Sequence, residues 1–335
     1  MDEIRWGIIG CGNVTEVKSG PAFNKVPHSR LVAVMRRDGD LAADYARRHG
    51  VPKWYDRAEN LINDPDVNAI YIATPPGSHA EYTIRAAQAG KPVYVEKPMA
   101  LNFAECLQMI EACEKAGVKL FVAYYRRCLP LFVKVKEWID TGAIGDVRFI
   151  AIRMLTPVNQ AEASPARLHW HVTPEIAGGG YVYDVGSHQI DLMDYYFGAI
   201  QEVRAFAGNQ AGLYPVEDFV SASFRFESNV FGNGIWCFTV PERERSDRIE
   251  IFGSKGKIIT STFDGGPAWL INDDGEVKYP FSAPENIQQP MIETVVAELR
   301  GENGKCPSTG VSGARANWVL DEITREYKKM KGIGG

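Results

Sequence analysis

Residues 4–15 read IRWGIIGCGNVT, a short apolar strand pattern followed directly by a glycine-rich turn and the start of a helical pattern. A dinucleotide-binding fold places its pyrophosphate at such a turn, because the helix N-terminus offers unpaired N–H donors. The third glycine of the usual fingerprint is Thr15 here, so a plain strand-to-helix turn is the alternative. We interpret the turn as a dinucleotide site formed by Gly10, Gly12, Asn13 and Val14.

Further apolar runs indicate a sheet covered by helices. They occupy residues 30–35, 68–73, 92–96 and 118–122, with helical stretches between them. The clearest helix follows Asn102, a good N-cap with Glu105 in the capping-box position, and it ends at Gly117. Short strands that alternate with helices predict a doubly wound parallel sheet. We therefore expect an N-terminal Rossmann domain over residues 1–123, in a protein of the α/β class.

The pattern changes after about residue 125. Long runs of alternating apolar and polar residues follow, at 147–156, 217–226, 231–239, 248–252 and 257–262. Asp-Gly, Asn-Gly and Gly-Gly pairs separate several of them, which is typical of antiparallel hairpins. We expect residues 124–335 to form an α+β domain with a large, open, mostly antiparallel sheet, used for substrate binding and oligomerisation.

The composition excludes several classes of protein. The chain has 335 residues and a net charge of -5 without a run of Lys or Arg, which argues against nucleic acid as the main partner. Apolar runs of membrane-spanning length are absent, so we expect no membrane partner. The six cysteines show neither a Cys-x-x-Cys pair nor a His/Cys metal spacing. We expect reduced thiols, no metal site and a cytoplasmic protein.

The end of the second apolar run bears on the choice of cofactor. NAD-binding folds usually carry an acidic residue there that bonds the ribose hydroxyls. This chain reads VMRRD at 34–38 instead. Arg36 and Arg37 can clamp a 2′-phosphate, and one guanidinium can stack on adenine. The alternative is that both arginines are solvated and Asp38 is the ribose carboxylate. We favour NADP(H), with NAD as the alternative.

Two further motifs suggest proton-transfer chemistry. Residues 178–191 read GGGYVYDVGSHQID, and three glycines in a row allow close backbone approach to a ligand. A helical turn would put Asp184 and His188 on one face, and a carboxylate beside an imidazole suits proton transfer. An N-cap and a satisfied surface histidine are the alternative. Lys97 follows a predicted parallel strand, at the sheet edge where open α/β folds bind ligands. A solvated lysine is the alternative there.

The motifs occur in one order: the glycine turn, Thr74-Pro75 with His79, Glu-Lys-Pro at 96–98, and the glycine run before Asp184 and His188. In this order the chain resembles, over nearly its whole length, the Gfo/Idh/MocA oxidoreductase family. That family includes glucose–fructose oxidoreductase, inositol dehydrogenases and dihydrodiol dehydrogenases. The resemblance implies hydride transfer between a nicotinamide and a carbon bearing a hydroxyl or carbonyl, on a sugar, cyclitol or similar polyol.

The resemblance also implies residue roles. Lys97 would hydrogen-bond the reacting oxygen, and His188 would relay the proton, with Asp184 orienting or charging it. The nicotinamide would be lined by Thr74, Pro75, His79, Glu96, Lys97 and Trp170, and the substrate by Lys97, Tyr124, Arg126, His171, Asp184 and His188. Relatives often carry arginine after the tryptophan, where this chain has His171. For Tyr124 and Arg126, packing at the domain junction is the alternative.

Two other activities occur among such proteins. Some relatives use tightly held NAD to oxidise a sugar transiently and cleave its glycosidic bond, and one is a regulator that senses the dinucleotide. The paired arginines count against the first, and Lys97, Asp184 and His188 together count against the second. The alternating runs after residue 145 leave one sheet face in need of cover, and relatives form dimers or tetramers. We expect a homodimer or homotetramer.

Overall fold

The computed structural model describes residues 1–158 and 168–333, which fold into two compact units. The first unit comprises residues 1–100, 104–129 and 283–314, and the second comprises 101–103, 130–282 and 315–335. We expected a single boundary after residue 123. The first unit instead also includes the later segment 283–314. This segment is held there by long-range hydrogen bonds, such as those from Gln288 Nε2 to Glu96 Oε1 and from Ser308 Oγ to Val122 O. Local periodicity carries no sign of such contacts.

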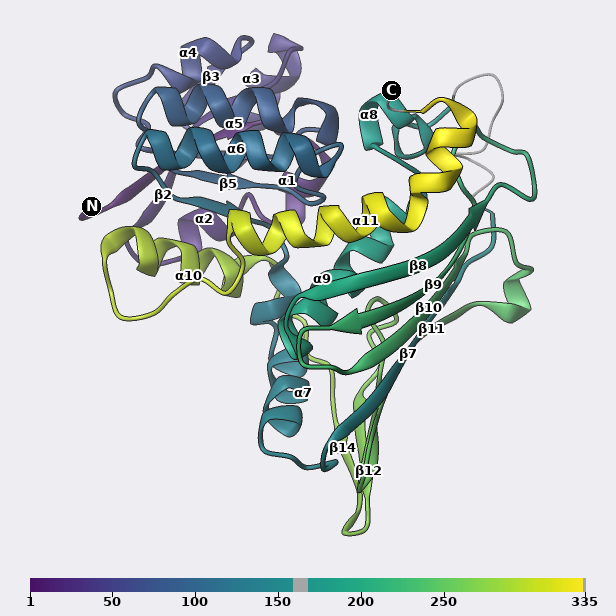
Figure 1. Ribbon diagram of the computed structural model, residues 1–335. Helices are drawn as coiled ribbons and strands as arrows, with labels where there is room; N and C mark the ends of the chain where they lie inside the picture. Colours follow the sequence, from purple (N-terminus) through teal and green to yellow (C-terminus); the bar gives the residue numbers. More distant parts are fainter. Residues whose placement is uncertain (159–167, 334–335) are drawn as a thin grey trace. The chain divides into compact units, whose positions relative to one another are not determined.

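The first unit is built on a six-stranded parallel sheet with the order β3-β2-β1-β4-β5-β6 (Figure 1). Its strands are β1 (Ile4–Ile9), β2 (Ser29–Met35), β3 (Lys53–Tyr55), β4 (Ala69–Ile72), β5 (Val93–Val95) and β6 (Leu120–Val122). Except for the edge strand β3, they are almost entirely buried, as expected when helices cover both faces. This strand order is that of dinucleotide-binding folds, so the predicted Rossmann sheet is confirmed.

Helices of the first unit lie on both faces of this sheet. They are α1 (Asn13–Val17), α2 (Ala22–Lys25), α3 (Gly39–His49), α4 (Ala58–Ile62), α5 (His79–Gln88), α6 (Phe103–Lys115) and α10 (Gln289–Arg300), with 3₁₀ turns η1 (Pro76–Ser78) and η2 (Tyr125–Cys128). In Figure 1, α5 and α6 run side by side over one face. The helices α2 and α10 pack against each other, and they contact β2 and β1 respectively.

The second unit contains an eight-stranded sheet with the order β14-β13-β12-β11-β7-β10-β9-β8. The strands are β7 (Val147–Leu155), β8 (Ile200–Gly208), β9 (Phe219–Phe226), β10 (Phe231–Cys237), β11 (Ser246–Gly253), β12 (Gly256–Thr260), β13 (Ala268–Asn272) and β14 (Gly275–Tyr279). The pairs are antiparallel except β7 with β10, so the expected mostly antiparallel sheet is confirmed. Three strands were not predicted, among them β14, whose residues are nearly all exposed and so show no alternation.

Helices cover one face of this second sheet. The helical segments of the second unit include α7 (Pro130–Asp140), η3 (Trp170–Val172), α8 (Pro174–Ala177), the π-helix η4 (Val182–Gly186), α9 (Ser187–Phe197) and η5 (Glu242–Glu244). Helix α11 (Gly310–Lys331) begins in the first unit and continues into the second. Figure 1 shows α7 and α9 on the same side of the sheet, and every residue of α9 except Tyr195 is buried. We call the opposite side, which carries Phe149, Phe231 and Ile235, the outer face of the sheet.

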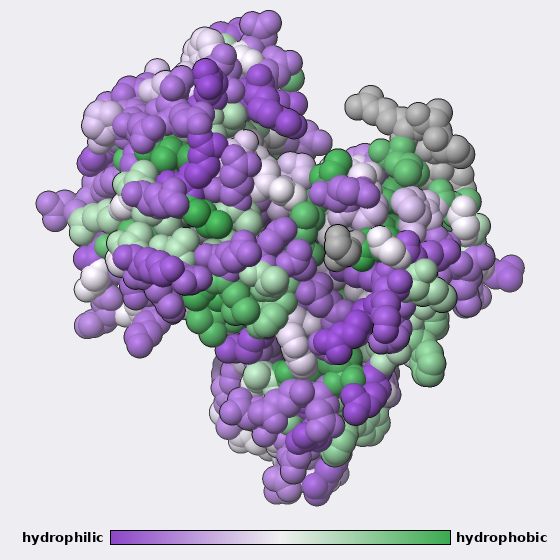
Figure 2. All heavy atoms as spheres, turned by 45° about the horizontal axis from the view of Figure 1, so that its top comes forward, coloured by the Kyte–Doolittle hydropathy of each residue, from purple (hydrophilic) through white to green (hydrophobic). Residues whose placement is uncertain are grey.

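The surface is largely polar. Figure 2 shows one face of the molecule, on which hydrophilic residues predominate and apolar ones form separate patches. Among the described residues, the model has no helix that is both long and apolar enough to span a membrane. The largest fully buried side chains include Trp6 in the first unit and Trp236 in the second.

Candidate functional site

The glycine turn after β1 has the shape that a phosphate group requires. Gly10 has φ 95°, a conformation that favours glycine, and a Cβ there would lie 2.7 Å from Thr74 Cγ2. The amides of Gly10 and Cys11 donate to Met35 O at 2.8 and 3.2 Å, which ties the turn to the end of β2. A Cβ on Gly12 would meet only Gly10 O, at 3.9 Å, so the turn leaves open space at that position.

Thr15, in place of the third fingerprint glycine, is built into the turn. Its side chain is buried, and Oγ1 accepts from Gly12 N at 3.0 Å and donates to Gly12 O at 2.8 Å. The close packing that the third glycine normally permits is found at Gly20 instead. A Cβ on Gly20 would lie 2.2 Å from Thr15 O and 2.3 Å from Tyr45 Oη. The incomplete fingerprint is therefore compatible with a tight dinucleotide turn.

The two arginines after β2 are exposed beside this turn. Arg36 Nη1 donates to Cys11 O at 3.5 Å, which places its guanidinium next to the glycine loop. Asp38 Oδ1 accepts from Leu41 N at 3.1 Å and so caps α3. One oxygen of Asp38 is thus engaged in capping, and all three side chains at the end of this strand, Arg36, Arg37 and Asp38, are exposed.

Lys97 lies at the carboxyl edge of the parallel sheet, just after β5, and its peptide bond to Pro98 is cis. The neighbouring Glu96 is buried, and its Oε1 accepts from Tyr71 Oη and Gln288 Nε2, both at 2.6 Å. Its Oε2 accepts from Lys97 N at 3.2 Å. The structure thus places the Glu96 carboxylate in a buried network that fixes the backbone carrying Lys97.

His79 joins the two loops at this edge. Its side chain is fully buried, with Nε2 2.7 Å from Thr74 O and Nδ1 3.1 Å from Pro98 O. A neutral imidazole can donate to only one of these carbonyls. Burial lowers the pKa of His79, while the two carbonyl oxygens oppose this by favouring the protonated ring. In either protonation state the ring holds the Thr74–Pro75 loop, where Thr74 is half-buried and Pro75 is exposed.

The two candidates after β6 are buried. Tyr124 is fully buried, and Arg126 is 5% exposed within η2. The guanidinium of Arg126 lies 5.0 Å from the ring centroid of Tyr125, and Nη1 donates to Tyr125 Oη at 3.1 Å. Lys97, Tyr124 and Arg126 all belong to the first unit, whereas Trp170, His171, Asp184 and His188 belong to the second.

The segment that carries Asp184 differs from the α-helical turn that we expected. Residues Val182–Gly186 form a π-helix, which widens the repeat, and α9 begins only at Ser187. Asp184 Oδ2 lies 3.8 Å from Nε2 of His171, which comes from η3. Short π-helical segments occur frequently at functional sites. The four-residue spacing therefore reflects a π-helix followed by an α-helix, which the sequence pattern did not reveal.

His188 is buried at the start of α9, and one aromatic contact there was not predicted. Its ring centroid lies 5.6 Å from that of Phe263, with the rings at 75°. Phe263 follows β12 and is partly exposed. The rings of Trp170 and His171 are 3.8 Å apart between centroids. In the second unit, His188 thus contacts Phe263, while His171 lies beside both Trp170 and Asp184.

The glycine run fits against protein atoms. Gly178 has φ 85°, and a Cβ there would lie 2.6 Å from Leu101 O. A Cβ on Gly180 would lie 2.4 Å from Glu217 O, and Gly180 N donates to Glu217 Oε1 at 2.7 Å. Glu217 is fully buried, and burial raises the pKa of its carboxyl. The absence of Cβ atoms at Gly178 and Gly180 therefore makes room for neighbouring protein atoms. From the sequence we expected it to make room for a ligand.

Comparisons with known proteins agree with this geometry. Residues 4–124 match the model of an oxidoreductase family with an NAD-binding Rossmann fold, and residues 132–259 match the GFO/IDH/MocA C-terminal domain. Oxidoreductase P35 of Formosa agariphila is 41% identical over 95% of this chain and 97% of its own length. Myo-inositol 2-dehydrogenase of Thermotoga maritima is 29% identical over 95% of this chain and 93% of its own.

A solved structure shows the same fold. Aldose-aldose oxidoreductase from Caulobacter crescentus, complexed with glycerol, aligns with a TM-score of 0.84 and 25% sequence identity, covering 98% of each chain. Together with the Rossmann strand order, the glycine turn and the matches to both family domains, these similarities settle the assignment: this chain is an oxidoreductase and belongs to the Gfo/Idh/MocA family.

Proposed function

We propose that this protein is an NADP(H)-dependent dehydrogenase or reductase that acts on a sugar, cyclitol or similar polyol. The observation that carries the proposal is the fixed position of Lys97 at the carboxyl edge of the Rossmann sheet, with its backbone held by the buried Glu96. That edge is where open α/β sheets bind their ligands. Relatives named for myo-inositol and aldose substrates support the substrate class.

The first unit would hold the dinucleotide. Gly10, Gly12, Asn13 and Val14 would bind the pyrophosphate, since the turn has open space at Gly12 and a helix start beside it. The exposed Arg36 and Arg37 would bind a 2′-phosphate through charge-assisted hydrogen bonds. The nicotinamide supplies or accepts the hydride when bound. Side chains of this chain would carry out the accompanying proton transfer.

Calorimetry tests the cofactor preference. We expect NADPH to bind more tightly than NADH, and replacing both Arg36 and Arg37 with Ala should cost roughly 1–3 kcal/mol in NADPH binding. Arg47→Ala is the matched control, because this exposed arginine lies on α3 and pairs with Asp44. Equal affinities of the unmodified protein for the two cofactors would contradict the assignment.

The proposed chemistry assigns one task to each polar group. The Lys97 ammonium would hydrogen-bond the reacting oxygen and stabilise a developing alkoxide. His188 would give or take the proton of that oxygen, and Asp184 with His171 would support it electrostatically. Lys97→Ala and His188→Ala should each lower turnover by about 10²-fold or more, and the double variant should be little worse than the worse single one. If the losses of turnover in the two single variants add up in the double variant, Lys97 and His188 act independently and not as one unit.

A substrate panel distinguishes this activity from glycoside cleavage. Polyols, aldoses and aryl glycosides are offered with each cofactor, and the nicotinamide absorbance and the released phenol are followed together. Net reduction of the cofactor by a polyol supports the dehydrogenase. Release of phenol without a net change in cofactor absorbance would favour the redox-assisted glycosidase instead.

We also propose that the protein is a homo-oligomer that pairs through the outer face of the second sheet. Phe206 of β8 and Ile235 of β10 are exposed, and both lie opposite the same residue of β9, so their side chains share that face. Phe149 is exposed there too and pairs directly with Phe231. Exposed apolar groups of this kind are typical of interfaces. Light scattering at micromolar concentration should give a dimer or tetramer, and Phe206→Asp should shift it towards monomer. A monomeric wild-type protein would refute the proposal.

A further inference from the structure

The loop that follows β12 brings an aromatic ring to His188, the proposed proton carrier. The ring centroids of Phe263 and His188 are 5.6 Å apart and the rings lie at 75°, an edge-to-face arrangement that aromatic pairs favour. His188 is 3% exposed, whereas Phe263 is 38% exposed. The more exposed ring of Phe263 therefore covers part of the buried imidazole and restricts the orientations that it can adopt.

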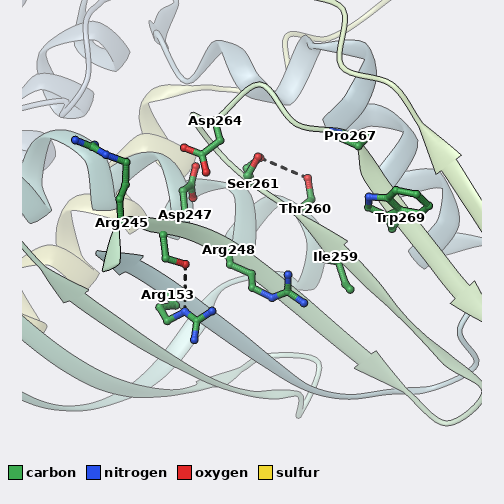
Figure 3. A pocket seen from close by; sticks show the side chains of 11 residues that line it. Arg153, Arg245, Asp247, Arg248, Ile259, Thr260, Ser261, Asp264, Pro267 and Trp269 are labelled. Atoms are coloured by element: carbon green, nitrogen blue, oxygen red, sulfur yellow. Dashed lines mark hydrogen bonds between the residues drawn. The ribbon is translucent and has the colours of Figure 1, made fainter. Parts of the chain in front are cut away.

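A buried carboxyl group holds this loop. Asp247 of β11 is 7% exposed, and its Oδ2 accepts from Thr262 N at 2.7 Å and from Phe263 N. Figure 3 shows a surface pocket that Asp247 borders, with the Asp247 side chain directed toward the loop that carries Asp264. Because one oxygen accepts from two successive backbone N–H groups, Asp247 determines where the Phe263 side chain leaves the main chain.

The same carboxyl group is bound to the helix that carries His188. Asp247 Oδ1 accepts at 3.2 Å from Nε2 of Gln189, the residue after His188. Gln189 Oε1 in turn accepts from Trp236 Nε1 at 2.6 Å, and both of these side chains are fully buried. Because the indole can only donate, the Gln189 amide has to turn its nitrogen toward Asp247. The hydrogen bonds therefore run in one direction, from Trp236 to Asp247, and they tie the loop to α9.

Keeping a charge at this position costs stability. Both oxygens of Asp247 accept hydrogen bonds, which fits the ionised carboxylate. Burial nevertheless raises the pKa of Asp247, because water is removed from the charge. Groups with perturbed pKa values cluster at functional sites, and this one joins α9 to the loop that contacts His188. The position of Asp247 therefore indicates a role in the site and not only in packing.

We propose that Phe263 and Asp247 are positioning residues for proton transfer by His188. The inference rests on the proposed function, because it requires His188 to exchange a proton with the substrate. Phe263 acts through its contact with the imidazole, and Asp247 acts through the loop that carries Phe263. A small misplacement of a reacting group is enough to slow a reaction severely, so loss of either residue should lower kcat. The KM for the polyol and the affinity for the cofactor should change little.

Steady-state kinetics of the full-length protein with the best polyol of the panel tests the role of the ring. Phe263→Leu keeps an apolar side chain and removes the aromatic ring, so kcat should fall by about tenfold or more while KM is almost unchanged. Phe263→Tyr keeps the ring and should retain kcat within about threefold of the wild type. A raised KM with an unchanged kcat in Phe263→Leu would overturn the positioning role, because Phe263 would then act by binding substrate.

A second pair of variants tests the hydrogen bonds. Asp247→Asn should lower kcat, because an asparagine that keeps its oxygen for the loop turns its NH2 group toward Gln189 Nε2. Adding Gln189→Glu supplies an acceptor for that NH2 group and still accepts from Trp236 Nε1, so the double variant should regain most of kcat. Asp264→Asn is the matched control, an exposed carboxyl in the same loop, and it should leave kcat unchanged. A double variant no faster than Asp247→Asn would overturn the role of this network.

A spectroscopic measurement that needs no substrate follows the contact itself. In protein with isotope-labelled histidine, the ring protons of His188 are assigned from the signals lost in His188→Ala. Phe263→Leu should shift these signals, because the ring current of Phe263 is removed, and Phe263→Tyr should leave them nearly in place. A wild-type protein without turnover on any polyol would contradict the proposed function itself. An active wild type with near-normal kcat in Phe263→Leu would overturn the positioning role alone, and unshifted His188 signals in that variant would overturn the contact.

Discussion

Glu217 offers a sharp test of how the π-helix is held. It is fully buried, its Oε1 accepts from Gly180 N at 2.7 Å, and its Oε2 has no hydrogen-bond partner among the described residues. Glu217→Gln keeps a carbonyl oxygen for Gly180 N and removes the ionisable group. We expect the variant to retain the fold and to become more stable than the wild type as the pH rises.

The direction follows from proton linkage. Burial raises the pKa of Glu217 above its ordinary value of 4.5, so the folded protein keeps a proton that the unfolded chain loses. The stability of the wild type should therefore fall as pH rises from 4.5 towards the folded pKa, by at most about 1.4 kcal/mol per pH unit from this group. Below pH 4.5 both states are protonated, and the two proteins should differ little from this cause.

Urea unfolding, followed by tryptophan fluorescence at a series of pH values, measures this difference. The gap in free energy of unfolding between Glu217→Gln and the wild type should widen with pH above 4.5. Glu276→Gln in the exposed strand β14 is the control, and it should show a constant gap. Parallel stability curves for Glu217→Gln and the wild type would refute the reasoning, because Glu217 would then titrate alike in both states.

Three other changes have defined outcomes. Gly10→Ala puts a Cβ 2.7 Å from Thr74 Cγ2 at φ 95°, so we expect about 1–3 kcal/mol of strain and tenfold or weaker dinucleotide binding by calorimetry. Gly180→Ala places a Cβ 2.4 Å from Glu217 O, and turnover should fall more than cofactor affinity because the clash displaces the π-helix. Hydrogen bonds from Arg48 lower the pKa of Glu16 to about 2, so its stabilisation is complete above pH 4.5 and is lost as pH falls towards 2. In acid titrations followed by circular dichroism, Glu16→Gln should therefore lose less stability than the wild type over that window; an unchanged acid transition would contradict this.

The sequence was sufficient for features that depend on neighbouring residues. The strand and turn at residues 4–15 indicated the Rossmann sheet, because a buried parallel strand followed by Gly-x-Gly is a local pattern. Asn102 and Gly117 marked a helix that the structure places at Phe103–Lys115. The alternating runs in the second half predicted an antiparallel sheet, since one of its faces is exposed.

Features that depend on distant residues could not be predicted. Gly20 takes over the close packing of the missing third glycine because Tyr45 folds back onto Thr15. The segment just before the π-helix is tied by the hydrogen bond from Gly180 N to Glu217 Oε1, a residue 37 positions later. The contact of Phe263 with His188 joins the loop after β12 to α9. The pairing of Arg153 with Arg248 follows from strand register, and neither contact is visible in the local sequence.

The central claim is that Lys97 and His188 handle the proton of a hydroxyl whose carbon exchanges a hydride with a nicotinamide. The most direct measurement is the steady-state rate of NADP⁺ reduction with the best polyol of the panel, for wild type, Lys97→Ala and His188→Ala, with cofactor affinity determined in parallel. The account predicts turnover lower by about 10²-fold or more in each variant, with cofactor affinity almost unchanged in His188→Ala. Near-normal turnover in His188→Ala would contradict it.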